Sequence, residues 1–260
     1  MSYRPVFRPG GHRPTLVCSV SDKSEIDCVC TIRNALFDGA DGFLFHLERM
    51  DPAVQNKEAL KRIFAYTEDR PVLTVNYRTG GKTDDELAAL QMEAVEAGAG
   101  CVDVMGDMFA RCELELTHDP EAVKRQGEYI ARIHDAGAQV MMSSHILKYV
   151  ETDYLLSHAL EMERRGADIV KLVTGASGEE ELIKGLDQTR LLKNTLHVPF
   201  LHIIGGQYGK VHRAIAPTLG SCMVLCVERY TPAGNKDKPL LRATRSLYDS
   251  LDWVRTRDKA

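Results

Sequence analysis

The chain contains 260 residues, of which 44% are hydrophobic and 27% are charged, and this composition is typical of a soluble globular protein that can bury a large core. Lys and Arg total 33 against 37 Asp and Glu, for a formal net charge of −4, and the lack of a basic run with interleaved aromatic residues argues against nucleic acid as a partner. No segment approaches the roughly 18 apolar residues of a membrane span, and the basic N-terminus lacks the apolar stretch of a signal peptide, so we expect a cytoplasmic protein with no membrane partner.

Short apolar segments rich in β-branched residues recur along the chain, and each is followed by a longer amphipathic segment. The predicted strands cover residues 15–20, 43–47, 72–77, 101–105, 139–143, 168–173, 199–204 and 221–227. The predicted helices cover residues 22–37, 53–67, 83–97, 119–136, 152–165, 178–194, 208–217 and 239–256. Three strands follow a helix that ends in a glycine turn, within FDGADGF, EAGAGCV and RRGADIV, a common way to end a helix before a buried strand.

This strict alternation of strand and helix predicts the fold class. An unbroken β/α order implies a parallel sheet, and eight repeats favour closure into a (β/α)8 TIM barrel over an open doubly wound sheet. No GxGxxG sequence opens a helix after the first strand, so nothing supports dinucleotide binding. We expect residues 1–14 to form an N-terminal extension and residues 15–260 to form one catalytic barrel domain. Catalytic groups of such barrels lie at the C-terminal ends of the strands, so polar residues there are the candidates.

The second and third predicted strands carry polar side chains near their C-terminal ends. Alternation places His46 and Glu48 on one face of the second strand, where they would point into the barrel and either bind substrate or form a structural pair. In the third strand, Asn76 and Arg78 share a face while Tyr77 lies on the other. We expect Asn76 and Arg78 to point inward, with Arg78 holding a substrate oxygen or carboxylate.

The fifth and sixth predicted strands carry the residues with the strongest chemical signal. Alternation places Lys171 on the same face as Ile169 and Val173, so its amine is expected to point into the barrel. Burial of a charged amine is costly and favours the neutral form that attacks a carbonyl. His145, at the end of the fifth strand, would lie beside it and could transfer protons. The pair predicts imine chemistry; the alternatives are a lysine that extends to solvent from a strand end and a histidine bonded to a loop carbonyl.

A glycine-rich loop follows the seventh predicted strand and leads to Arg213. Glycines permit a close approach of the backbone to a ligand, and an arginine near the start of a helix can hold an anion. Arg213 is therefore a further candidate for substrate binding.

Taken together, these segments resemble the type I 3-dehydroquinate dehydratase family over most of the chain. The most specific are MMSSHI and, at the family's distance, GADIVKLV, which are similar to the segments with the histidine and the Schiff-base lysine. VPFLHIIGGQYGKVHRAIAPTLGS and RPVLTVNYRTGG are similar to the segments with two substrate-binding arginines. The resemblance implies that Lys171 forms an imine with the substrate ketone, that His145 is the general acid and base, that Arg213 binds the carboxylate and that Arg78 helps to hold the ring. It also implies a homodimer and a role in the shikimate pathway of aromatic amino acid biosynthesis.

The sequence departs from the family on the substrate side. The family has a glutamate between its third-strand arginine and two glycines, whereas RTGG here contains none, so the carboxylate that supports the histidine is missing. We do not expect Glu86 to replace it. His46 and Glu48 stand where the family has Arg and Asp, and the last loop, TPAGNK, places Lys236 at the lid as a further candidate to contact substrate. These changes make a related hydroxylated cyclic keto acid a second candidate substrate.

We therefore expect a Schiff-base lyase that dehydrates 3-dehydroquinate or a related hydroxylated cyclic keto acid. Such a dehydration needs no metal or diffusible cofactor, because the iminium is the electron sink. The seven cysteines form no CxxC pairs that would supply a zinc site. Two alternatives remain open: a class I aldolase that uses the same lysine on a phosphosugar, and a non-catalytic binding barrel derived from the family, which the missing glutamate favours.

Overall fold

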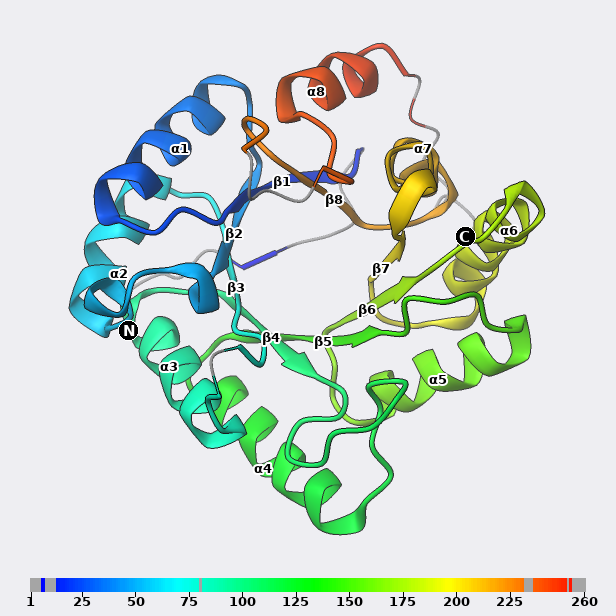
Figure 1. The fold of residues 1–260 in the computed structure, drawn as a ribbon, viewed down its shortest axis with the longest axis horizontal. Helices are drawn as coiled ribbons and strands as arrows, with labels where there is room; N and C mark the ends of the chain where they lie inside the picture. Colours follow the sequence, from blue (N-terminus) through cyan, green and yellow to red (C-terminus); the bar gives the residue numbers. More distant parts are fainter. Residues whose placement is uncertain (1–5, 8–12, 80, 232–235, 252, 254–260) are drawn as a thin grey trace.

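The computed structural model describes residues 6–7, 13–79, 81–231, 236–251 and 253. Within these ranges, parallel strands form one sheet that curves into a ring, with α-helices around its outside (Figure 1). The strands are β1 (Thr15–Val20), β2 (Gly42–His46), β3 (Val72–Val75), β4 (Cys101–Met105), β5 (Gln139–His145), β6 (Ile169–Thr174), β7 (Phe200–Ile204) and β8 (Met223–Cys226). The α-helices are α1 (Glu25–Phe37), α2 (Lys57–Phe64), α3 (Asp84–Ala97), α4 (Pro120–Asp135), α5 (Thr152–Arg164), α6 (Glu179–Thr195), α7 (Gly209–Ile215) and α8 (Leu241–Asp249).

The sheet closes almost completely into a barrel. Neighbouring strands pair in the order β7-β6-β5-β4-β3-β2-β1-β8, which leaves β7 and β8 at the two ends of the pairing order. The backbone N–H of Cys222, just before β8, donates to the carbonyl of Phe200 in β7 at 2.8 Å. The predicted single-domain (β/α)8 TIM barrel is therefore confirmed. Element ends differ by a few residues from the prediction, as in the last helix, which covers 241–249 instead of 239–256.

Apolar side chains fill the barrel interior and the layer between strands and helices. Leu44, Val75, Met141, Ile169 and Leu201, from five different strands, belong to one interior cluster. The alternate residues of the strands pack outward against the helices in two further clusters. A polar side chain on the inner face therefore reaches the mouth of the barrel only near the C-terminal end of its strand. None of the helices in the described part of the chain has the length and apolarity needed to cross a bilayer.

Phe7 closes the N-terminal end of the barrel. Its side chain is buried in the interior cluster, and its backbone exchanges two hydrogen bonds with the side chain of Gln139 at the start of β5. A Cβ at Gly42 would lie 2.9 Å from the Phe7 ring, so glycine leaves room for the aromatic side chain. At least this residue of the predicted N-terminal extension is part of the barrel core, while residues 1–5 and 8–12 of that segment lie outside the described residues.

The predicted orientation of the third strand is wrong. β3 pairs with β2 so that Val75 lies beside His46, and paired residues of parallel strands face the same side of the sheet. The inner face therefore continues from Val75 to Tyr77, and Asn76 turns outward, where its side-chain amide donates to the carbonyl of Leu87 in α3 at 3.1 Å. Side-chain polarity misled the prediction, because a strand buried on both faces can place a polar group under a helix when the backbone satisfies it.

Candidate active site

Lys171 lies in the middle of β6, with its side chain inside the barrel. Its side chain is 4% exposed, and its Nζ donates to Oδ2 of Asp103 in β4 at 2.9 Å. It also donates a short hydrogen bond to the hydroxyl of Tyr77, which follows β3. Asp103 from β4 and Tyr77 from the segment after β3 therefore converge at this amine.

Asp103 is a buried anion that balances the charge of the amine. Its Oδ1 accepts a hydrogen bond from the hydroxyl of Ser143 in β5, and its Oδ2 also accepts from the hydroxyl of Tyr77 at 3.2 Å. Burial, and then the nearby Asp103 carboxylate, raise the pKa of Tyr77 well above its ordinary value, so the phenol keeps its proton. A carboxylate and a neutral phenol thus hold the amine in one position.

His145 lies at the end of β5 and packs against the same phenol. The ring of Tyr77 meets the imidazole edge-on, with centroids 4.9 Å apart. Nδ1 of His145 and its backbone N–H both lie 2.8 Å from Oε2 of Glu115. Because an ionised carboxylate only accepts, Nδ1 carries the proton and Nε2 is left as the acceptor. Lys171, Tyr77, His145 and Glu115 therefore form one continuous group.

Glu115 is a functional candidate that the sequence analysis missed. It lies in the loop between β4 and α4, thirty residues before the histidine that it contacts, and no periodic pattern connects the two positions. Burial acts to raise its pKa, but the interactions with His145, above all the side-chain hydrogen bond, outweigh burial and leave the pKa below its ordinary value. Glu115 therefore stays ionised and supplies the carboxylate that the RTGG segment lacks. Glu86, by contrast, is exposed and caps α3 through Thr83.

A second group of polar side chains comes from β1, β2 and the residues before α8, and its His46 ring lies 6.3 Å from the ring of Tyr77. Nζ of Lys238 donates to Oγ of Ser19 at 2.8 Å and lies 3.3 Å from Nε2 of His46. The other ring nitrogen of His46, Nδ1, lies 2.9 Å from Oε1 of Glu48. Burial, then the charge of Lys238, hold the pKa of His46 well below its usual range, and burial raises the pKa of Glu48 to about 7.

Arg213 lies on α7 with most of its hydrogen-bonding capacity unused. The residue is 7% exposed, and neither Nε nor Nη1 has a hydrogen-bond partner among the described residues. Burial lowers its pKa to about 10, an effect that the charge of Asp237 partly offsets, so the guanidinium stays charged at neutral pH. A buried guanidinium with free donors is suited to hold an anion.

Three predicted substrate-binding residues are not brought into these groups. The side chain of Arg78, 20% exposed, pairs with two carboxylates, Asp84 at 2.7 Å and Asp107 at 2.8 Å, which neutralise it. Asn76 faces α3 and not the barrel interior. Lys236 is exposed, and the lysine two residues further along the chain carries its amine into the mouth instead.

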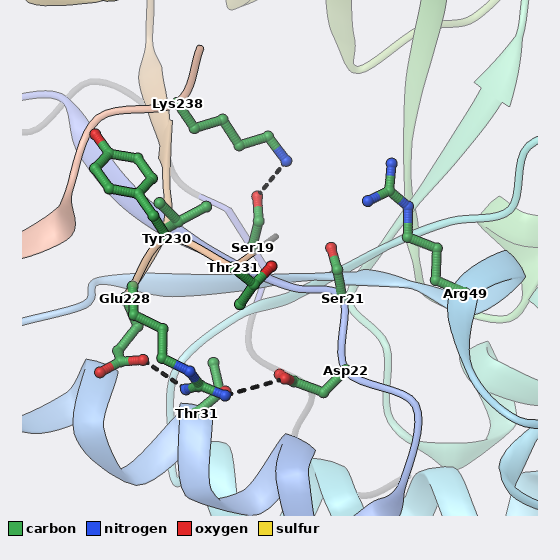
Figure 2. A pocket seen from close by; sticks show the side chains of 11 residues that line it. Ser19, Ser21, Asp22, Thr31, Arg49, Glu228, Tyr230, Thr231 and Lys238 are labelled. Atoms are coloured by element: carbon green, nitrogen blue, oxygen red, sulfur yellow. Dashed lines mark hydrogen bonds and ion pairs between the residues drawn. The ribbon is translucent and has the colours of Figure 1, made fainter. Parts of the chain in front are cut away.

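A pocket opens beside the second group of polar side chains, between β1, the residues after β8 and the 3-10 helix η1 (Leu47–Arg49). Figure 2 shows Lys238 and Arg49 approaching this pocket from two sides, with Ser19 holding the lysine amine. Arg229 at the rim is paired with two carboxylates, so its charge is neutralised. The pocket therefore leads from the surface to a lysine that no carboxylate neutralises within the described ranges.

Comparison with known families shows what the chain is similar to. A family model described as type I 3-dehydroquinase matches residues 36–234, a range that includes Lys171, His145 and Arg213. Over 123 residues the chain is 32% identical to the 3-dehydroquinate dehydratase of Alkaliphilus oremlandii, in a match that covers 46% of this chain and 47% of that protein. Over 152 residues it is 28% identical to the 3-dehydroquinate dehydratase of Lactiplantibacillus plantarum, with 58% of each chain covered. The chain thus spans about half the length of the curated relatives that it matches.

Solved structures extend the similarity of fold to nearly the whole chain. The type I 3-dehydroquinate dehydratase from Clostridium difficile, solved with covalently modified comenic acid, superposes with a TM-score of 0.79 at 17% identity. The superposition covers 96% of this chain and 98% of that chain. The strands and helices described above therefore follow the arrangement of that barrel.

Proposed function

The chain belongs to the type I 3-dehydroquinase family, and on this premise we propose that it is a Schiff-base lyase that dehydrates 3-dehydroquinate or a closely related hydroxylated cyclic keto acid. One observation carries the proposal. The amine of Lys171 donates a hydrogen bond to the hydroxyl of Tyr77 inside the barrel, and the Tyr77 ring packs against His145. An amine and an imidazole that are separated by one side chain can act on neighbouring atoms of a single substrate.

The proposed reaction proceeds through an imine. The ammonium of Lys171 first gives one proton to Nε2 of His145, and the neutral amine then adds to the substrate ketone. His145 returns this proton as the ketone oxygen leaves as water, so that a cationic iminium remains. The iminium acidifies the adjacent C–H bond, Nε2 of His145 takes the proton, and an enamine forms. The enamine expels the hydroxyl group on the next carbon, and His145 returns the proton to it, so that one water leaves. A further water hydrolyses the product iminium and restores the amine.

The other members of the group support this sequence. Asp103, 2.9 Å from the amine, places a negative charge beside the cationic iminium and thereby stabilises it. Glu115 keeps Nε2 of His145 available as the proton acceptor. No set of His, Cys, Asp and Glu side chains in the described residues could hold a metal ion, and the proposed reaction requires none because the iminium is the electron sink.

The substrate is held by the groups that retain free hydrogen-bonding capacity. We assign the carboxylate of the substrate to Arg213, and a ring hydroxyl to Glu48, whose Oε2 is buried without a hydrogen-bond partner among the described residues. His46 orients Glu48 through the 2.9 Å contact between them. A ligand with one carboxylate and several hydroxyl groups satisfies these donors and acceptors together.

Reductive trapping tests the proposal. Sodium borohydride reduces an imine to a stable amine, so we expect 3-dehydroquinate with borohydride to leave a covalent adduct on the peptide that contains Lys171, detected by mass spectrometry. A Lys171→Met variant should give no adduct, whereas a Lys61→Met variant, altered at an exposed lysine of α2, should be labelled like the wild type. Trapping of a phosphosugar instead would favour aldol cleavage. Absence of an adduct with every keto acid would contradict both enzymatic hypotheses and favour a binding barrel.

We also propose, on the family resemblance, that the protein is a cytoplasmic homodimer. Sedimentation equilibrium should then give twice the chain mass of 29.0 kDa. A single species at the chain mass would contradict the dimer.

A further inference from the structure

Lys238 is a buried cation without a counter-charge. The residue is 8% exposed, yet its amine contacts only a serine hydroxyl at 2.8 Å and an imidazole nitrogen at 3.3 Å. No carboxylate forms an ion pair with it in the described part of the chain, whereas Lys171 is paired with Asp103 at 2.9 Å. A buried ammonium in neutral surroundings is costly, so this position requires either loss of the proton or an anionic ligand.

The ionisable groups around Lys238 strengthen this requirement. They come from the elements that pack against it: Arg213 on α7, Lys171 on β6, Arg49 in η1, Cys18 on β1 and His46 on β2. Burial, and then the charges of Arg213, Lys171 and Arg49, lower the pKa of Lys238 to about 7. In the free protein at neutral pH, the amine is therefore divided between its charged and neutral forms.

Neighbouring groups in the mouth also lack partners. Nε and Nη1 of Arg213 and Oε2 of Glu48 are buried and unbonded among the residues that the structure describes. Arg213 and Lys238 are suited to an anion, and Glu48 is suited to a hydroxyl donor. A hydroxylated carboxylate supplies both kinds of group in one molecule.

We propose that Lys238 joins Arg213 in binding the carboxylate of the ligand, and that Lys238 takes up a proton when this carboxylate binds. The inference rests on the proposed function, because it identifies the anion as the carboxylate of a hydroxylated ring. The ligand supplies the counter-charge that Lys238 lacks, so the ammonium form is favoured in the complex. Arg213 is charged with or without ligand, and Lys238 is the group whose charge depends on binding.

Proton uptake on binding determines how the affinity for the ligand changes with pH. The free amine titrates near pH 7, and the amine in the complex titrates at higher pH. The ligand therefore binds most tightly below pH 7 and loses affinity as the pH rises through this value. The carboxylate of the ligand stays ionised throughout this range. From the titration of Lys238 alone, we expect the affinity to fall about tenfold between about pH 6 and pH 8.

Calorimetry with quinate measures the coupling between ligand binding and proton uptake on the intact protein. Quinate is the alcohol that corresponds to 3-dehydroquinate, so it presents the same carboxylate and ring hydroxyls but has no ketone with which to form an imine. Titrations at one pH in buffers with different ionisation enthalpies give the number of protons taken up on binding. At pH 7 we expect uptake of about half a proton per site, since about half of the free amines are neutral there.

Four variants isolate the contribution of Lys238. Lys238→Arg keeps a permanent charge, so quinate should bind without proton uptake and without the loss of affinity above pH 7. Lys238→Met should bind at least about tenfold more weakly at pH 6, because it removes a charge-assisted hydrogen bond. Glu48→Gln removes the neighbouring group with a pKa of about 7, and proton uptake should persist. Lys61→Met is the control for loss of one exposed lysine and should match the wild type.

The outcomes that overturn the inference are separate from those that overturn the proposed function. Wild-type proton uptake in Lys238→Arg, unchanged affinity in a folded Lys238→Met, or no quinate binding at any pH would each overturn the role of Lys238. Borohydride trapping of 3-dehydroquinate on Lys171 does not depend on how Lys238 titrates. If trapping failed while quinate still bound with proton uptake, the dehydratase proposal would be overturned and the carboxylate site would remain in place.

Discussion

The carboxylate of Glu115, in the loop between β4 and α4, fixes the imidazole of His145. The backbone nitrogen and Nδ1 of His145 both lie 2.8 Å from one oxygen of Glu115. This one carboxylate therefore sets both the position of the ring and the location of its proton. The hydrogen bonds from His145 keep the pKa of Glu115 low in spite of its burial, and the carboxylate remains an acceptor at neutral pH. Glu115 acts through the histidine and is a positioning residue.

Glu115→Gln should therefore lower kcat much more than it changes KM. The amide removes the ionic part of the contact, which is worth about 1.5–3 kcal/mol for a hydrogen bond to a charged group, so we expect kcat for 3-dehydroquinate to fall about 10- to 100-fold. Glu113→Gln is the matched control, because Glu113 lies two residues earlier in the same loop with its side chain 81% exposed. Steady-state kinetics of the two variants give the comparison. Equal kcat values would show that Glu115 does not position His145.

The loop between β4 and α4 is the element that brings Glu115 to His145. The N–H of Gly106 donates to the carbonyl of Ser143 in β5 at 2.8 Å, and its carbonyl accepts from the N–H of Thr117 at 3.3 Å. A Cβ at Gly106 would lie 2.4 Å from the carbonyl oxygen of Glu115. Because that oxygen belongs to the backbone, it cannot turn away as a flexible side chain would. Glycine at this position therefore allows the two ends of the loop to pack together.

Gly106→Ala should disturb activity and stability together. The added methyl group must displace the backbone at Glu115, so we expect a loss of about 1–3 kcal/mol in the free energy of unfolding and at least about a tenfold loss in kcat. Gly127→Ala in α4 is the control, since a Cβ there meets nothing within 4 Å, and alanine should raise helix stability by about 0.5–1 kcal/mol. Urea unfolding and steady-state kinetics measure both effects. If Gly106→Ala kept the wild-type kcat, the close packing at Gly106 would not be needed to place Glu115 beside His145.

The sequence predicts the elements and the inner faces of most strands better than it predicts the groups that loops contribute. Alternation along β2 and β6 places His46 and Lys171 correctly, because the direction of alternate side chains is a local property of a strand. For β3 the pairing with β2 decides the inward face, and side-chain polarity alone gave the wrong face for Asn76. Glu115 contacts His145 across 30 residues of sequence, and Lys238 contacts His46 across 192. No local sequence pattern predicts contacts between positions so far apart.

At the scale of the whole molecule, the barrel has one open end and one closed end. Lys171 and Lys238 lie at the C-terminal mouth, whereas Phe7 fills the opposite end below Gly42 and Gln139. The interior cluster contains residues from every strand, so a side chain that seals this cluster from water contributes to the stability of the complete ring. Although Phe7 precedes β1 and lies at the end of the barrel opposite Lys171, it therefore belongs to the folding unit.

Phe7→Ala should destabilise the barrel without altering the active site. Truncation of a buried phenylalanine removes its apolar contacts and leaves a cavity, which costs about 3–5 kcal/mol. The free energy of unfolding, measured by urea titration, should fall by this amount, and kcat measured well below the unfolding temperature should stay at the wild-type value. Phe37→Ala is the matched control, because Phe37 at the end of α1 is 93% exposed and its truncation should change stability by no more than about 0.5 kcal/mol. If the two variants lose the same small amount, the aromatic ring of Phe7 does not close the barrel and contributes little to its core.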